Sequence, residues 1–95
     1  MTVLNIAFTE IKNTEKMQAY IDAAAPLMKV YGAEVVIRGR YLKSLLGNTK
    51  SPHIAGVFRF PDMETAERFY SCEEYVSLIP LRDQAGKMTF NFYEE

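Results

Sequence analysis

The sequence is poor in the residues that mark specialised chemistry. Its 95 residues include one cysteine (Cys72), one histidine (His53) and no tryptophan. A lone cysteine cannot form an internal disulfide, which fits a reducing compartment. The histidine and the cysteine match no metal-ligand spacing, so we expect no metal site. Phosphate-binding loops, dinucleotide fingerprints and the Gly-x-Ser-x-Gly motif are also missing, so we expect no cofactor and none of the enzyme classes that these motifs mark.

Charge and hydropathy exclude further classes. The chain has 11 basic and 12 acidic residues and a net charge of -1, which gives no field to attract nucleic acid. No stretch approaches the roughly 18 apolar residues of a membrane span, and the N-terminus lacks a cationic segment followed by an apolar run. We therefore expect a cytoplasmic protein without a nucleic-acid or membrane partner. Hydrophobic residues make up 48% of the chain, which is enough for a packed core.

The first half of the chain contains two strand patterns and one helix pattern. A short apolar run predicts a strand over residues 2–8. Apolar residues at helical spacing follow, with a possible cap at Asn13 or Thr14 and a stop at Gly32. Pro26 lies inside this helix and should bend it. High β-branched content then predicts a second strand over residues 33–42.

The second half repeats the order strand, helix, strand. Turn-forming residues at 47–52 predict a loop, and an apolar segment at 54–60 predicts the third strand. Asp62 can cap a second helix. Beyond that helix we expect only a short helical turn near residues 74–78, because Pro80 divides the segment. Alternating apolar residues predict the fourth strand over residues 88–93.

This order predicts one α+β domain over residues 1–95 with the ferredoxin-like topology β-α-β-β-α-β. Its four antiparallel strands should carry two helices on one face. Simple alternation in the second strand would put Val35 and Ile37 on one face, and Glu34, Val36 and Arg38 on the other. Both faces are then partly apolar, so something should cover the face without helices. A second copy of the chain is the simplest partner, which predicts a homodimer through the open sheet face.

The chain from about Tyr20 onward resembles the DUF1330 family, a domain of unknown function within the dimeric α/β-barrel superfamily. The resemblance rests on seven short landmarks in order: Tyr31-Gly32-Ala33, Ile37-Arg38-Gly39, Leu45-Leu46-Gly47, Phe60-Pro61-Asp62, Phe69-Tyr70-Ser71, Glu74-Tyr75 and Leu81-Arg82. It implies a ferredoxin-like fold and a dimer whose two sheets pack together. It implies no established reaction.

Two positions depart from the pattern of that family. Leu46 stands where the resemblance implies an acidic residue, and Ile54 stands where it often implies an arginine. Both members of a possible ion pair are therefore replaced together, which avoids leaving one charge unpaired. If these positions line a pocket, the pocket of this chain is less polar than that of its relatives.

Three residues are the candidates for ligand binding. Arg38 comes first, because a guanidinium fixed on a strand can bind a carboxylate or enolate with two parallel hydrogen bonds. The alternative is a structural ion pair with Glu34 or Glu74. Arg82 is the candidate second cation, or it merely ties down its own segment. Tyr70 is the candidate phenolic partner, because a tyrosine combines an apolar ring with a polar tip.

His53 is the candidate general base, because histidine has an unperturbed pKa near neutrality. The alternative is a solvated histidine without a catalytic role, which is the commoner case for a lone histidine in a loop. Tyr20 and Tyr31 also offer phenols that could bind a ligand, but they are expected to be core aromatics. The pattern predicts that Cys72 follows the second helix rather than begins one, and Glu73 beside it disfavours the thiolate, so we expect it to be dispensable.

The sequence leaves three functions open. The first is a homodimer that binds a small organic carbonyl or carboxylate compound. The second is an enzyme resembling the cofactor-independent monooxygenases or isomerases of the dimeric α/β-barrel type. The third is a non-catalytic structural dimer. A solvent-accessible cavity containing one of the candidate cations would favour the first two.

Overall fold

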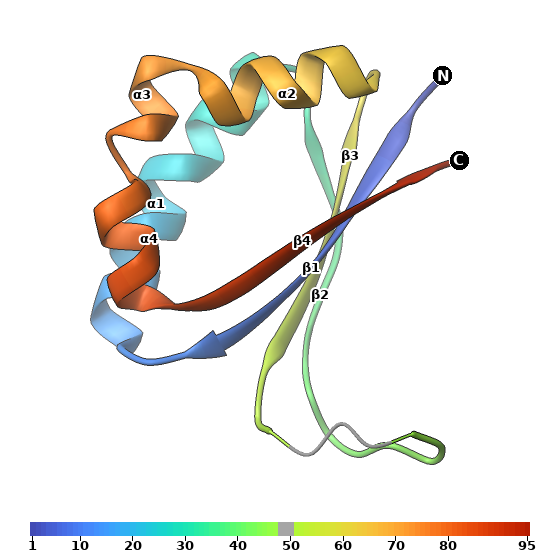
Figure 1. The fold of residues 1–95 in the computed structure, drawn as a ribbon, viewed down its shortest axis with the longest axis vertical. Coiled ribbons are helices and arrows are strands. Elements are labelled where there is room, and N and C mark those ends of the chain that lie inside the picture. Colours follow the sequence, from blue (N-terminus) through green and yellow to red (C-terminus); the bar gives the residue numbers. More distant parts are fainter. Residues whose placement is uncertain (48–50) are drawn as a thin grey trace.

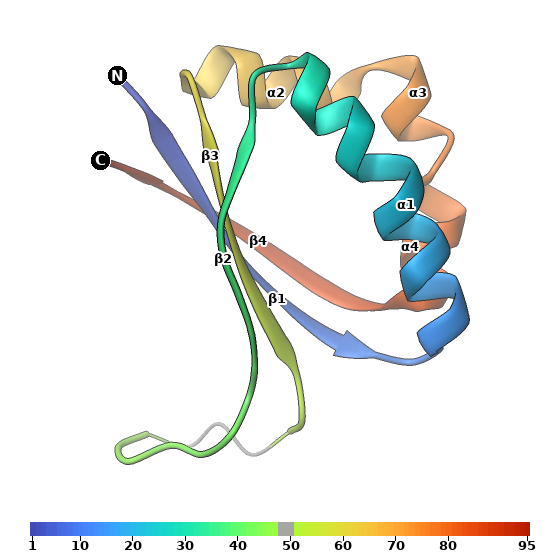
Figure 2. The ribbon, with the colours of Figure 1, turned by 180° about the vertical axis from the view of Figure 1, so that it is seen from behind.

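The computed structural model describes residues 1–47 and 51–95. Within them lie the following elements: β1 (Val3–Ile11), α1 (Thr14–Val30), β2 (Glu34–Arg40), β3 (Ile54–Phe60), α2 (Met63–Ser71), α3 (Glu73–Val76), α4 (Ile79–Ala85) and β4 (Gly86–Glu94). The strands form an antiparallel sheet in the order β2-β3-β1-β4. All these helices lie on one side of the sheet (Figure 1), as the view from behind also shows (Figure 2). The predicted ferredoxin-like fold is confirmed.

Side-chain caps set the starts of the two longer helices. Asn13 accepts a hydrogen bond of 2.9 Å from the backbone of Lys16 and begins α1, which runs on through Pro26. Asp62 accepts one of 2.7 Å from the backbone of Thr65 and begins α2. A capping oxygen satisfies an amide that has no partner in the first helical turn. Gly32, at a positive φ of 75°, then lets the chain turn after α1.

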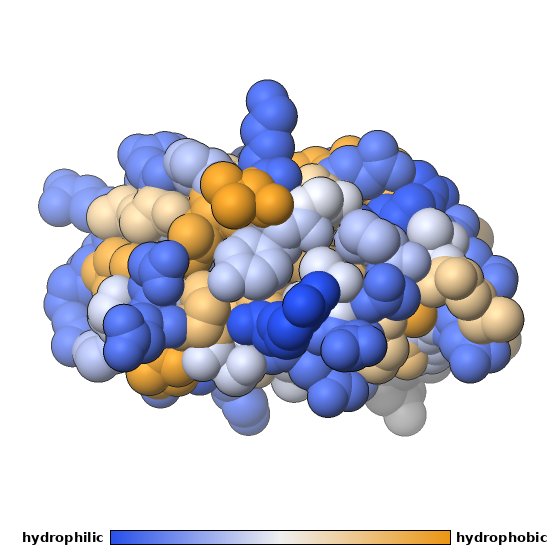
Figure 3. Space-filling model, turned by 90° about the horizontal axis from the view of Figure 1, so that it is seen from above, coloured by the Kyte–Doolittle hydropathy of each residue, from blue (hydrophilic) through white to orange (hydrophobic). Residues whose placement is uncertain are grey.

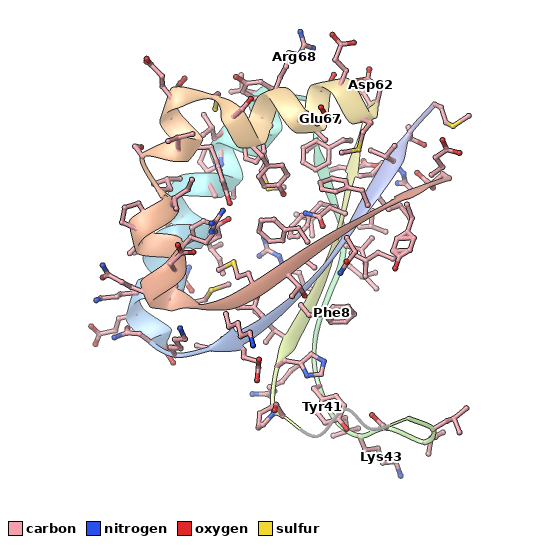
Figure 4. The ribbon with its side chains drawn as sticks, in the orientation of Figure 1. Phe8, Tyr41, Lys43, Asp62, Glu67 and Arg68 are labelled. Carbon is pink, nitrogen blue, oxygen red and sulfur yellow. The ribbon has the colours of Figure 1, made fainter. Side chains whose placement is uncertain are left out.

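Helix α2 is amphipathic. It buries Thr65, Ala66 and Phe69, while Glu67 and Arg68 are exposed. Arg68 points away from the sheet in Figure 4, and hydrophilic side chains cover much of this end of the molecule in Figure 3. The charged face of α2 is therefore a solvated surface.

Several predicted boundaries were wrong. β1 continues beyond residue 8 to Ile11, because Thr9 is buried and stays paired with both neighbouring strands. The fourth strand is also longer than residues 88–93. The segment after α2 holds two helices, α3 and α4, rather than one turn. Pro80 lies in the first turn of α4, where its missing N–H removes no intrahelical hydrogen bond.

Strand β2 contains a β-bulge that sequence alternation did not predict. Its pairing with β3 shifts between Val35 and Ile37. Val35 lies opposite Phe58 and Arg38 opposite Gly56, whereas Ile37 lies opposite Val57. Partners across an antiparallel sheet point to the same side, so Val35 and Arg38 share the helix side and Ile37 points to the other. The prediction that Val35 and Ile37 share one face was wrong, since the bulge reverses the alternation.

The core lies between the helices and one face of the sheet. Its largest fully buried side chains are Tyr75, Phe60, Phe69 and Asn5. The aromatic rings pack at tilted or edge-to-face angles, with ring centroids 5.1 Å apart for Phe69 and Tyr75. Asn5 is a polar exception on the helix side of β1.

The opposite side of the sheet, here called the open face, carries apolar side chains without a helix over it in the described residues (Figures 1 and 2). By strand pairing it comprises Leu4, Ile6, Phe8, Ile37, Ala55 and Val57. Figure 4 shows Phe8 on this side, pointing away from the helices. Ile37 is 62% exposed. An apolar sheet face in water is a typical interaction surface.

After β2 the chain forms an arm, residues 41–47, that extends beyond the end of the sheet (Figures 1 and 2). Its three leucines, Leu42, Leu45 and Leu46, are 89–95% exposed. Of the loop predicted at 47–52, residues 48–50 lie outside the described residues. In the part of the chain that the structure describes, no helix is long and apolar enough to cross a membrane.

Candidate functional site

A cavity of about 300 Å³ lies between α1 and the helix side of the sheet. Its wall is formed mainly by apolar and small residues: Ala7, Thr9, Tyr20, Ile21, Ala24, Ala25, Met28, Arg38, Gly39, Ile54, Ala55, Gly56, Phe58, Phe69, Tyr70, Met88 and Phe90. Small residues form much of this wall: Ala7 of β1 pairs with Gly56 of β3, and Ala24 and Ala25 lie on α1. Pockets for small organic ligands begin at about this volume and have this balance of many apolar and few polar groups.

Arg38 brings the one guanidinium that lines this cavity. Its side chain is exposed, and its guanidinium carbon lies 6.0 Å from the ring centre of Phe58. Among the described residues it forms no ion pair. The alternative of a pair with Glu34 was wrong, because the bulge puts Glu34 opposite Arg59, with 2.6 Å between their side-chain atoms.

Arg59 is instead the structural arginine of the sheet. Its guanidinium also contacts Glu95, at 2.5 Å and 2.9 Å, in a two-pronged pair. Hydrogen bonds from Arg59 and Thr2 lower the pKa of Glu95 to about 2. This pair ties the C-terminal end of the chain to β3, so Arg59 is not available to a ligand while Arg38 is.

Two tyrosines on the cavity wall take part in hydrogen bonds. Tyr70 accepts one of 2.8 Å from the side-chain amide of Asn5. The hydroxyl of Tyr20 lies 2.9 Å from that of Tyr75, which stands behind it in the core. Burial, and secondly the neighbouring Tyr75, raises the pKa of Tyr20 and of Tyr70 above the usual tyrosine value. Both phenols are therefore neutral hydrogen-bond donors at ordinary pH.

The sequence favours a core role for Tyr20 over a ligand-binding one. Tyr20 is 9% exposed and belongs to the core, but it also lines the cavity. Sequence could not separate the two roles, because an apolar position at helical spacing looks the same whether a side chain or a cavity lies opposite. Tyr31 packs on Phe69, with 5.5 Å between ring centres, and lies outside the cavity wall.

Arg82 does not line the cavity. It donates a hydrogen bond of 3.2 Å to the hydroxyl of Tyr75 and one of 3.1 Å to Asp83. Its guanidinium carbon also lies 5.9 Å from the ring centre of Tyr75. The structure thus brings Arg38 and Tyr70 to the same cavity, and connects Arg82 to it only through Tyr75 and Tyr20.

His53 lies away from this group. Its ring stacks on Tyr41 at 4.7 Å between centres and meets the edge of Phe8 at 5.7 Å, and its Nδ1 is 2.9 Å from the carbonyl oxygen of Ser51. Phe8 belongs to the open face, so His53 packs against a residue on the other side of the sheet. His53 is not among the residues that line the cavity. Of the four candidates from the sequence, Arg38 and Tyr70 line the cavity, whereas Arg82 and His53 do not.

The two departures from the family pattern also lie apart. Ile54 lines the cavity, where an arginine would have added a second guanidinium. Leu46 is 95% exposed in the arm. Only one of the two positions therefore makes this cavity less polar, and the cavity that results has one cation, two phenols and a long apolar wall.

Sequence comparison matches residues 2–95 to the family described as Domain of unknown function (DUF1330). No curated protein matches the chain. Among solved structures, the RPA0582 protein of unknown function from Rhodopseudomonas palustris is similar with a TM-score of 0.86 and 14% identity, over 99% of this chain and 82% of that one.

Two other solved structures are similar over 99% of this chain. SnoaB, a cofactor-independent oxygenase from Streptomyces nogalater, has a TM-score of 0.73 and 6% identity over 92% of its own length. A dimeric ferredoxin-like protein of unknown function from Bacteroides fragilis has a TM-score of 0.58 and 12% identity over 96% of its length. At these identities the likeness shows the fold alone.

Proposed function

Because the chain belongs to the DUF1330 family, a domain of unknown function, we infer its function from its own cavity. We propose that it is a homodimer that binds a small organic molecule there. The ligand class is a largely apolar, flat compound bearing a carboxylate or carbonyl group. The observation that carries the proposal is a cavity of about 300 Å³ with a guanidinium, Arg38, that has no acidic partner among the described residues.

Arg38 would bind the charged or polar end of the ligand. Its guanidinium offers parallel N–H donors that match a carboxylate. A buried charge pair would be worth about 2–5 kcal/mol on truncation, but Arg38 is exposed and therefore screened by water. We accordingly expect a contribution of about 1–2 kcal/mol, which is roughly 5- to 30-fold in affinity. The apolar wall supplies the remainder through burial of the ring system.

Isothermal titration calorimetry with 2-naphthoate and its neutral isostere 2-naphthamide tests this assignment. The wild type should prefer the carboxylate. Arg38→Ala should remove that preference, and Arg38→Lys should restore only part of it, because an ammonium lacks the planar fork. The matched control is Arg40→Ala, since Arg40 is the next cation on the same side of β2 and lies outside the cavity wall.

Melting curves without ligand separate binding from structure. Arg38→Ala should melt within about 2 °C of the wild type, because no ion pair is lost. A large loss of stability in Arg38→Ala, or a wild type that binds neither naphthyl probe, would contradict the proposed function. Arg59→Ala serves as the opposite control, because this substitution does break an ion pair.

The homodimer is proposed through the open face. Its apolar residues and the exposed leucines of the arm need a cover, and a second copy presents the same surface in return. The similar protein from Bacteroides fragilis is described as dimeric. Sedimentation at micromolar concentration should give twice the chain mass for the wild type and a single chain mass for Ile37→Glu. Val30→Glu, at an 80% exposed position of α1, is the control that should stay dimeric; a monomeric wild type would end this part of the proposal.

A cofactor-independent oxygenase is the second candidate, and likeness in fold to SnoaB supports it. An enzyme of this kind needs donors that stabilise an enolate oxygen, and the phenols of Tyr20 and Tyr70 are suited to that task. Oxygen uptake with phenolic naphthalene substrates would test it. A protein that binds naphthyl probes without consuming oxygen remains a binding protein, and one that binds none is a structural dimer.

A further inference from the structure

Among the described residues, four polar side chains line the cavity: Thr9, Tyr20, Arg38 and Tyr70. The hydroxyls of the two tyrosines are already bonded to Tyr75 and Asn5, at 2.9 Å and 2.8 Å, and neither partner lines the cavity. Asn5 also carries a side-chain oxygen that is buried without a partner, beside Tyr70 rather than on the wall. Both phenols thus belong to hydrogen bonds of the core, and Thr9 is left as the hydroxyl on the wall without a partner among the described residues.

The hydroxyl of Thr9 borders the cavity. Thr9 is 5% exposed, and its side chain forms no hydrogen bond to another described residue. In the described part of the chain, the one side-chain polar atom that is both fully buried and unpartnered is the oxygen of Asn5, so the oxygen of Thr9 retains contact with open space. The methyl group of Thr9 lies 3.0 Å from the place of a Cβ on Gly86, which directs the hydroxyl to another side. The open space that Thr9 lines is the cavity.

Strand pairing fixes the place of Thr9 relative to Arg38. Arg38 pairs with Gly56 and Gly56 with Ala7, so these three residues form one row across the sheet. Thr9 lies two residues beyond Ala7 on the same face of β1. Strands about 4.8 Å apart and residues about 3.3 Å apart then put roughly 12 Å between the Cα atoms of Arg38 and Thr9. The cavity therefore has a cation towards one end, a hydroxyl towards the other, and the small Ala7 and Gly56 as the floor between them.

We propose that Thr9 is a second ligand-binding residue of this cavity, and that the ligand is an aromatic carboxylate with a hydroxyl group at the end away from its acid. Arg38 binds the carboxylate, the rings lie over Ala7 and Gly56, and the ligand hydroxyl hydrogen-bonds to Thr9. A threonine hydroxyl both donates and accepts, so it matches another hydroxyl. This inference rests on the proposed function, because it assigns a further contact in the same cavity.

The surroundings of Thr9 favour a neutral group over a second charge. Ile54 and Met88 are its pairing partners on the two neighbouring strands, and both line the cavity. A charged group beside two apolar side chains and a single hydroxyl would lose its hydration without gaining a counter-ion. A hydroxyl needs only one partner here, and Thr9 supplies it. The site should therefore prefer a hydroxy acid to a diacid.

Calorimetric titration with 6-hydroxy-2-naphthoate and 2-naphthoate tests the contact, because the two probes differ only in the distal hydroxyl. One neutral hydrogen bond should make the wild type bind the hydroxy acid about 2- to 10-fold more tightly. Thr9→Val should bring this ratio near one, and Thr9→Ser should keep it. The matched control is Thr89→Val, since Thr89 is exposed on the open face and lies outside the cavity wall. The ratio within one variant cancels any general loss of stability.

Two further measurements separate ligand binding from a structural role of Thr9. Without ligand, Thr9→Val should melt at or above the Tm of the wild type, because no hydrogen bond to a described residue is lost and an unpaired hydroxyl leaves the interior. With 6-hydroxy-2-naphthoate bound, the methyl protons of Thr9 should show NMR cross-peaks to the ring that carries the hydroxyl. The methyl protons of Thr89 should show none.

The outcomes distinguish this inference from the proposed function. Equal binding of the two naphthoates by the wild type, or a preference that persists in Thr9→Val, would overturn the Thr9 contact while the cavity remained a binding site. A clear fall in the Tm of ligand-free Thr9→Val, or tighter binding of 2,6-naphthalenedicarboxylate than of the hydroxy acid, would overturn it as well. The comparison of probes on the wild type needs no variant to fold. If the wild type binds none of these naphthoates, the proposed function falls and the Thr9 contact with it.

Discussion

Filling the cavity should make the protein more stable and less able to bind. Ala24 is 4% exposed and lies on the cavity wall, in the middle of α1. Ala24→Leu adds three carbons. The cavity of about 300 Å³ is roughly ten times the 30 Å³ share of one water molecule, so there is room for them.

The expected gain follows from the apolar surface that leaves water. At about 0.8 kcal/mol per buried methylene, three carbons give an upper limit of about 2.4 kcal/mol. An imperfect fit lowers this value, because some rotamers of leucine will touch the opposite wall. We therefore expect the free energy of unfolding to rise by about 1–2 kcal/mol, and Tm by about 4–8 °C for each kcal/mol.

Chemical and thermal unfolding at one fixed protein concentration measure this gain, because dimer formation makes Tm depend on concentration. Ala23→Leu is the matched control: Ala23 is the exposed neighbour on the same helix and lies outside the cavity wall. It should change stability by less than about 0.5 kcal/mol. In Ala24→Leu, the affinity for 2-naphthoate should fall at least tenfold. A loss of more than about 1 kcal/mol in Ala24→Leu relative to this control would refute the reasoning, since the space would then be occupied already.

Three other predictions concern an ion pair, a helix cap and two glycines. Arg59 lowers the pKa of Glu95 to about 2, so the stability from this pair is complete above about pH 4.5 and is lost as the pH falls towards 2. Glu95→Gln should therefore make Tm depend less on pH between those two values. Cys72 caps α3 through its sulfur, so Cys72→Ser should keep the cap and change unfolding in urea by less than about 0.5 kcal/mol. A Cβ on Gly86 would lie 2.6 Å from a backbone oxygen of β1, so Gly86→Ala should cost about 1–3 kcal/mol, whereas Gly39→Ala, with nothing within 4 Å, should be nearly neutral.

Periodicity was sufficient for the order of the elements but not for their details. The six main elements follow from hydrophobic spacing and from caps such as Asn13 and Asp62, which are local signals. The bulge in β2 is set by pairing with β3, which the sequence of one strand does not contain. The pattern does not predict helix α4 because Pro80 suggests a break, although a proline in the first turn is compatible with a helix. Cys72 was also misplaced, since it begins α3.

The candidate site was predictable in part for the same reason. Arg38 and Tyr70 were chosen for the chemistry of their side chains, and both line the cavity. The partner of Arg38 could not be predicted, because the bulge decides that Glu34 faces Arg59. The hydrogen bonds from Arg82 through Tyr75 to Tyr20 join three helices, and no spacing along the chain indicates such a connection. Only the folded structure brings these three side chains together.

The bulge in β2 would also couple the two equilibria proposed above, dimerisation and ligand binding. It turns Ile37 towards the open face and its neighbour Arg38 towards the cavity, so one peptide bond separates a residue of the proposed interface from a residue of the proposed binding site. In the proposed dimer, a second copy that packs on Ile37 would contact β2, the strand that also carries Arg38. Reciprocity then holds by thermodynamic necessity: by whatever factor dimerisation changes the affinity for a ligand, the ligand changes the dimerisation constant by the same factor. With the proposed interface on one face of the sheet and the proposed cavity on the other, a ligand that does not touch the partner subunit could still regulate dimerisation.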